Sequence, residues 1–105
     1  MSEEYILAEA KHHEEDDERP ELPPADFDFL VYSLRLQAEM SLGLLPSSGK
    51  ARPDFEAAAH NIDLLAMLAA KTRGNLTADE QRSLDQSLME LRFRFVQAKD
   101  SFAKE

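Results

Sequence analysis

A helical hairpin in the second half of this 105-residue chain constrains the fold more than any other sequence feature. Two stretches with helical spacing of apolar residues are joined by a short turn, whose informative residues are Gly74, Asn75, Leu76, Thr77 and Glu80. Gly74 suits the left-handed conformation that ends a helix, and Thr77 with Glu80 forms a capping box that begins the next. The sequence therefore predicts antiparallel helices over about residues 54–73 and 78–100.

A third helix is predicted before the hairpin, over about residues 26–45. It must stop by Leu45, because Pro46 disfavours helical geometry in the residue before it. Gly43 either marks an earlier end or allows close contact with another helix. Because no segment shows the two-residue alternation of a half-buried strand, we expect an all-α fold of three helices.

The buried sides of the helices follow from their spacing. On the first helix we expect one stripe to cover the hairpin: Phe27, Leu30, Val31, Leu34, Ala38 and Leu42. On the second we expect Phe55, Ala59, Ile62, Ala66 and Ala69, flanked by Ala58 and Leu65. The third carries a seam of alternating three- and four-residue steps: Leu84, Leu88, Leu91, Phe95, Ala98 and Phe102. Such a seam is typical of near-antiparallel bundle packing or of coiled-coil contact.

The first helix also carries a second apolar stripe, roughly opposite the first: Phe29, Tyr32, Leu36 and Met40. A helix that is apolar on two sides is normally covered on two sides. This stripe is therefore the candidate interaction face, and we expect a homo-oligomer, with a dimer favoured, or a different protein partner. The alternative is that residues 46–52 or an apolar cluster near the amino terminus, Tyr5 to Ala8, fold over the stripe within one chain.

Charge separates an acidic tail from the rest of the chain. Residues 1–24 carry nine acidic and two basic side chains, a net −7 of the total −9. We expect this segment to be a disordered tail and residues 25–105 to form one helical domain. The chain has no cysteine, no basic start typical of a secretory signal, and no apolar stretch long enough to cross a bilayer. We therefore expect a cytoplasmic protein with no membrane contact.

Several short motifs resemble a known family of bacterial proteins, domain of unknown function 1844. The resemblance rests on Asp26 to Leu30, Leu42 to Pro46, Asn61 to Leu65, and the turn from Lys71 to Thr77, and it spans residues 26–96. It implies a small helical bacterial protein, and it implies no catalytic residue.

Candidate reactive groups are few. His12 and His13 precede a run of carboxylates, but a solvated polar run alone does not supply the fixed geometry of a metal site. Glu56, His60 and Asp63 are spaced to lie on one side of a helix, where a solvated surface with local ion pairs is the simpler interpretation. We expect no catalytic, cofactor-binding or metal-binding residue.

The basic side chains of the last helix leave one alternative function open. Arg82, Arg92, Arg94 and Lys99 make this helix the most basic segment. Nucleic-acid binding through them is the alternative to a non-enzymatic role in self-association or as an adaptor, and a metal-dependent enzyme is less favoured still. Nucleic acid is an unlikely partner, because the acidic chain repels phosphate.

Overall fold

The computed structural model describes residues 21–45 and 52–104 of the chain. In these residues it contains helices α2 (Phe27–Ser41), α3 (Phe55–Lys71) and α4 (Ala78–Ala103), and no strand. The predicted all-α class with three helices is thus confirmed. Residues 1–20 of the predicted tail, with His12, His13 and the cluster from Tyr5 to Ala8, lie outside the described residues.

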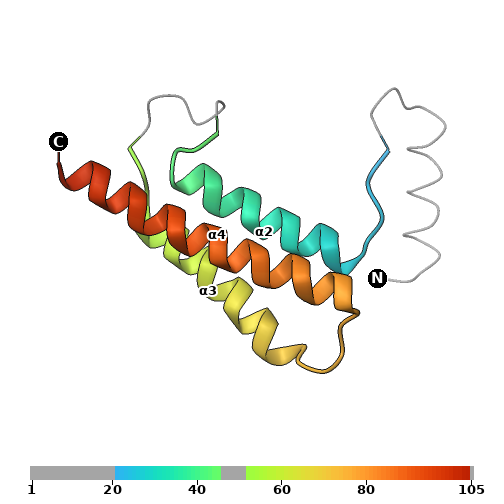
Figure 1. The fold of residues 1–105 in the computed structure, drawn as a ribbon. Coiled ribbons are helices and arrows are strands. Elements are labelled where there is room, and N and C mark those ends of the chain that lie inside the picture. The colour runs from blue at the N-terminus through green and yellow to red at the C-terminus, as the bar shows by residue number, and fades with distance from the viewer. Residues whose placement is uncertain (1–20, 46–51, 105) are drawn as a thin grey trace.

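The helices form a three-helix bundle in which each helix packs on the other two. Figure 1 shows that α2 and α4 point the same way, whereas α3 runs in the opposite direction. The hairpin of α3 and α4 is therefore antiparallel, as the sequence predicts. Helix α4 is the longest, with 26 residues against 15 in α2, and its carboxyl-terminal turns extend beyond the end of α2 (Figure 1).

Helix α2 is delimited by local hydrogen bonds at both ends. At its start, the Asp26 carboxylate accepts a hydrogen bond from the Phe29 amide at 2.8 Å. At its end, Gly43 has a φ of 75°, and the amides of Gly43 and Leu44 donate to the carbonyls of Met40 and Glu39, both at 3.0 Å. This pair of bonds is a Schellman motif. Helix α2 consequently stops at Ser41, four residues before the predicted limit, so Gly43 marks the earlier end.

The connection between α3 and α4 has the predicted chemistry. Gly74 has a φ of 81°, which lies in the left-handed region that glycine adopts without strain. The Thr77 hydroxyl accepts from the Glu80 amide at 3.1 Å, and the Glu80 carboxylate accepts from the Thr77 amide at 2.8 Å. The capping box is therefore complete, and it satisfies backbone donors that the first turn of α4 leaves without helical partners.

A small apolar core lies on the inner side of each helix. It consists of Val31, Ala38, Ile62, Leu65, Leu84, Leu88 and Leu91, with Phe27, Leu34, Ala66, Ala69, Leu76 and Phe95 packed against it. Two other apolar residues, Leu42 and Ala58, and two polar residues, Asn61 and Ser87, are also buried. Most of the predicted buried stripes are therefore in place.

The set of buried residues differs from the predicted stripes at three points. Leu30 is 44% exposed, because the adjacent residue Val31 points into the core and consecutive residues of a helix are rotated by about 100° about its axis. On α3 the most deeply buried residues are Ala58 and Leu65, expected only as flanks, while Ala59 is half-buried. Phe102 is 39% exposed, because it lies in the last turns of α4.

We predict that Gly74→Val destabilises the fold by about 1 to 2 kcal/mol or more, because residues with a Cβ are strained in the left-handed region. A Cβ at this position would meet no heavy atom within 4 Å, so the cost arises from the backbone and not from a clash. Urea unfolding measures it, with Gly74→Asn as the control, because asparagine tolerates this conformation. Equal stability of the two variants would contradict the argument.

We predict that Thr77→Ala lowers the free energy of unfolding by about 1 kcal/mol, because it removes the acceptor for the Glu80 amide. Thr77→Ser keeps the hydroxyl and should retain most of that stability. Thermal and urea unfolding of both variants test the contribution of the cap. A serine variant as unstable as the alanine variant would show that the hydroxyl is not the cause.

Candidate interaction faces

The predicted interaction stripe lies on the outer side of α2. We call Phe29, Tyr32, Leu36 and Met40 the α2 face. Three of its members are exposed in this chain, with Tyr32 the most exposed at 57%, and Leu36 is partly buried. The stripe therefore lies on the side of α2 away from the core, as the sequence predicts. Its use as an interface stays a prediction.

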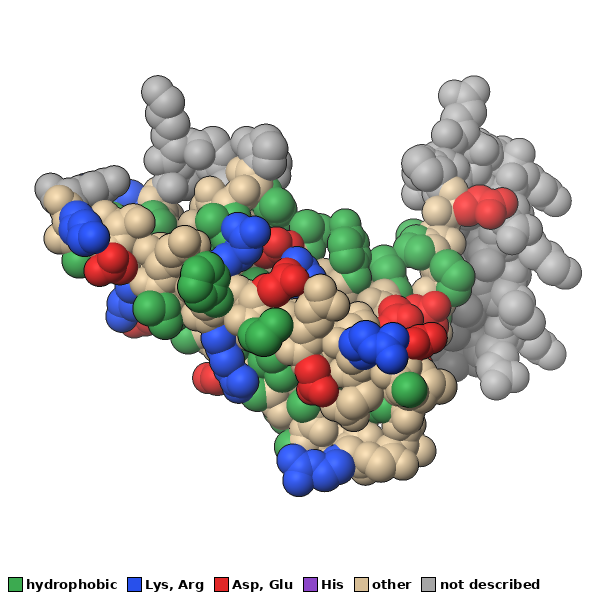
Figure 2. All heavy atoms as spheres, in the orientation of Figure 1, with side chains coloured by type: hydrophobic (Ala, Val, Ile, Leu, Met, Phe, Trp, Pro, Cys, Tyr) green, Lys and Arg blue, Asp and Glu red, His purple; other side chains and the backbone are tan. Residues whose placement is uncertain are grey.

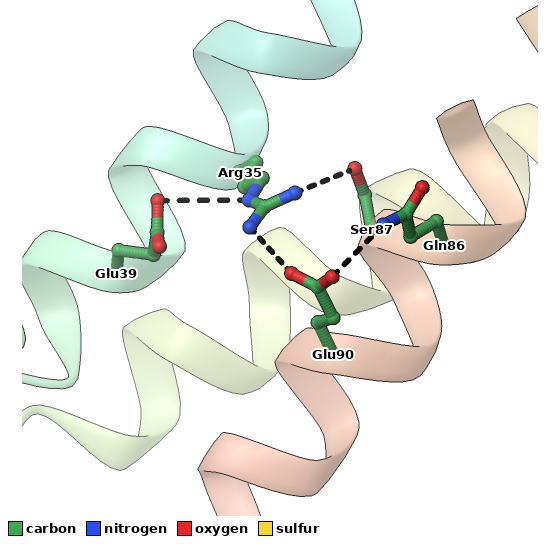
Figure 3. A network of polar contacts seen from close by, with 5 residues as sticks. All are labelled: Arg35, Glu39, Gln86, Ser87 and Glu90. Atoms are coloured by element: carbon green, nitrogen blue, oxygen red, sulfur yellow. Dashed lines mark hydrogen bonds and ion pairs between the residues drawn. The ribbon is translucent and has the colours of Figure 1, made fainter.

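A polar network beside the α2 face joins α2 to α4 (Figure 3). Arg35 Nη2 donates to Glu90 Oε2 at 2.5 Å, and Arg35 Nη1 donates to Ser87 Oγ at 3.4 Å. Arg35 Nε lies 3.8 Å from Glu39 Oε1, one turn further along α2. Gln86 Nε2 donates to the other Glu90 oxygen at 3.2 Å. Both Glu90 oxygens are therefore engaged, and the arginine links the two helices.

These contacts lower the pKa of Glu90 from its ordinary value. The largest cause is the hydrogen bond from Gln86, followed by the positive charge of Arg35, while partial desolvation acts in the opposite direction. Sequence reasoning missed the network, because Arg35 and Glu90 are 55 residues apart. The local signals were the four-residue spacings of Arg35 with Glu39 and of Gln86 with Glu90.

A second exposed apolar strip lies on the outer side of α4. Met89, Phe93 and Val96 are each between 65% and 67% exposed, which is more than any member of the α2 face. Figure 2 shows hydrophobic side chains on the surface over α4, with acidic and basic side chains between them. Their spacing of four and three residues was available in the sequence. Sequence reasoning missed this strip because it considered only the seam on the inner side of the same helix.

Aromatic rings and cations gather where the start of α3 meets the end of α4. The Phe55 ring makes edge contacts with the rings of Phe95 and Phe102, at centroid distances of 5.7 and 5.9 Å. Lys99 Nζ lies 5.6 Å from the Phe55 centroid, and the Arg52 guanidinium lies 5.7 Å from that of Phe102. Two basic side chains of this region thus lie over aromatic rings.

The side chains considered for chemistry on α3 are separate and solvated. Glu56, His60 and Asp63 are all exposed along one side of the helix. Within residues 21–45 and 52–104, no three histidine, aspartate or glutamate side chains are grouped to hold a metal ion. No helix in those same ranges is long and apolar enough to span a membrane.

Comparison with protein families gives a match over residues 24–97, to the family described as Domain of unknown function (DUF1844). The chain belongs to this family. The DUF1844 region begins two residues before the Asp26 cap and includes α2, α3 and most of α4, so it contains the α2 face, the Arg35 network and the α4 residues Met89, Phe93 and Val96. Comparisons with curated proteins and with solved structures gave no significant match.

We predict that the Arg35 network makes stability depend on pH. Because the folded-state pKa of Glu90 lies below its ordinary value of 4.5, the stabilisation is complete above about pH 4.5 and is lost as pH falls through the folded-state pKa. Glu90→Gln should therefore lose less stability than the wild type between pH 6 and pH 3. Unfolding by urea at a series of pH values measures the difference.

The matched control is Glu56→Gln, which removes an exposed carboxylate of α3 outside the network. This variant should keep the wild-type dependence on pH in the acidic range. If Glu90→Gln and Glu56→Gln changed the profile equally, the network would not be the source of the dependence.

Proposed function

We propose that this DUF1844 protein is a small, cytoplasmic, non-enzymatic protein that self-associates through the α2 face, with an adaptor role through the same face as the alternative. The observation that supports the proposal is the exposure of large apolar side chains in one continuous stripe, on the side of α2 opposite the core. Contiguous apolar surface of this kind is typical of protein contact sites. A second copy is the partner to which we commit.

The energetics favour a moderate association. In a two-fold contact each copy contributes the same four side chains, so eight are covered. Each is already about half covered in the single chain, so burying the remainder is worth roughly 6 to 12 kcal/mol in total, at half of the usual 1.5 to 3 kcal/mol each. Association costs an estimated 4 to 15 kcal/mol. The two quantities are comparable, so we expect association in the micromolar range.

Arg35 and Glu39 give this contact a polar border. Both side chains are partly exposed beside the stripe, and they hold each other and Glu90 in fixed positions. A fixed polar rim around an apolar centre is the usual anatomy of a protein interface. These fixed polar side chains therefore support a specific contact over non-specific association of apolar surfaces.

The dependence of binding on salt concentration distinguishes this role from nucleic-acid binding through the α4 arginines. Contacts between apolar stripes tolerate salt, whereas phosphate contacts weaken steeply as salt is raised. The net charge of −9 opposes binding to a polyanion. We expect self-association to persist at 0.5 M NaCl and the protein not to retain single-stranded or duplex nucleic acid at physiological salt.

We predict that Leu36→Glu reduces self-association at least tenfold, because it places a charge in the centre of the α2 face. Sedimentation of the full chain between about 1 and 100 µM measures the mass. Leu30→Glu is the matched control: it makes the same substitution on the same helix, at a residue that is 44% exposed but lies outside the stripe. Circular dichroism verifies that both variants fold.

The control variant should associate like the wild type. A wild-type protein that is monomeric throughout this range, or a mass that Leu36→Glu leaves unchanged in a folded protein, would contradict self-association through the α2 face.

A further inference from the structure

The proposed function leaves the outer side of α4 unexplained. Residues spaced by three or four positions along this helix form one exposed line, which we call the α4 strip: Arg82, Asp85, Met89, Phe93, Val96 and Asp100. Its apolar centre consists of Met89, Phe93 and Val96, which are the most exposed large hydrophobic side chains of the three helices. Charged residues lie at both ends of this centre. The strip thus has the apolar middle and polar margins of a contact site.

The charge of α4 reverses at its middle. Residues 78–91 contain four carboxylates and one arginine, a net charge of −3. Residues 92–104 contain four basic side chains and one carboxylate, a net charge of +3. A second α4 lying antiparallel would therefore bring the acidic half of each helix to the basic half of the other. The helix is electrostatically complementary to a reversed copy of itself.

The order of residues in the strip has the same symmetry. If a two-fold axis passes at the level of Leu91, position 89 of one chain lies opposite position 93 of the other, and position 82 lies opposite position 100. Met89 then meets Phe93, and Arg82 meets Asp100. A thioether against an aromatic ring is a favourable contact, and the second pair joins opposite charges. A single position of the two-fold axis therefore produces both favourable contacts.

We infer that α4 forms an antiparallel helix pair with the α4 of a second copy, centred on Met89 and Phe93 and related by a two-fold axis near Leu91. The helix is about 39 Å long at 1.5 Å per residue, so the pair can be in contact over several turns. Such a contact is self-complementary, as two-fold interfaces must be. It goes beyond the proposed function, because it uses a different helix, and either contact can form without the other.

A matched pair of methionine variants tests the contact. Met89→Glu places a charge at the centre of the α4 strip, whereas Met67→Glu makes the same change at an exposed position of α3. We expect Met89→Glu to halve the mass of the assembly in sedimentation, and Met67→Glu to leave it unchanged. Circular dichroism verifies folding of both, and the full chain is used throughout.

Comparison with Leu36→Glu separates this inference from the proposed function. A mass that falls with Met89→Glu but not with Leu36→Glu supports the α4 contact and overturns association through the α2 face. The opposite response overturns the α4 contact and leaves the α2 face in place. If both variants reduce the mass, both contacts are supported. A monomeric wild-type protein overturns both, whatever else covers the two surfaces.

A charge exchange tests the antiparallel register. Arg82→Glu brings a carboxylate to the partner's Asp100, which should weaken association roughly threefold to thirtyfold, since each dimer contains the contact twice. Adding Asp100→Arg in the same chain should restore it. Within one helix these residues are about 27 Å apart, well beyond the screening length at physiological salt, so restoration requires a second chain. A double variant as weak as Arg82→Glu alone would overturn the register.

Discussion

In a three-helix bundle each helix can direct only one side toward the core. In this chain α2 and α4 each carry large apolar residues on a second side as well. The core of the described residues is correspondingly small, with only Leu65, Leu84, Leu91 and Val31 as large, fully buried side chains. The α2 face and the centre of the α4 strip contain much of the apolar surface that remains exposed. A bundle of this size cannot cover that surface by rotating its helices, because turning one stripe inward would turn another outward.

The link between Arg35 and Glu90 forms on the side that this rotation of α2 leaves facing α4. It connects α2 and α4 at one side of their contact, and it adds a polar contact to the rotation that the apolar stripe of α2 favours. With Arg35 directed at α4, Val31 and Ala38 point into the core and Tyr32 points outward. An ion pair that is partly exposed contributes little to the free energy of unfolding, so burial of the apolar stripe, and not the link, determines the rotation of α2.

The start of α2, the end of α3 and the start of α4 could be predicted from the sequence because their determinants are local. The caps at Asp26 and Thr77 and the turn at Gly74 each depend on residues within about four positions. The rotation of the helices could be predicted only in part. Because α3 has alanines on two sides, its own sequence allows either side to face inward. Packing against the neighbouring helices buries Ala58 fully and leaves Ala59 half-buried. The Arg35 network depends on this rotation, so sequence spacing alone could not reveal it.

The charge distribution also limits how two copies can meet. Each chain carries −9, and residues 1–24 account for −7 of it, so two copies repel each other at long range. A parallel pair of α4 helices would add repulsion at short range, because it would bring acidic half to acidic half and basic half to basic half. The antiparallel pair replaces both repulsions with attractions and keeps Met89 next to Phe93. Among the ways of covering the α4 strip with a second α4, only the antiparallel one satisfies its apolar centre and its charged ends together.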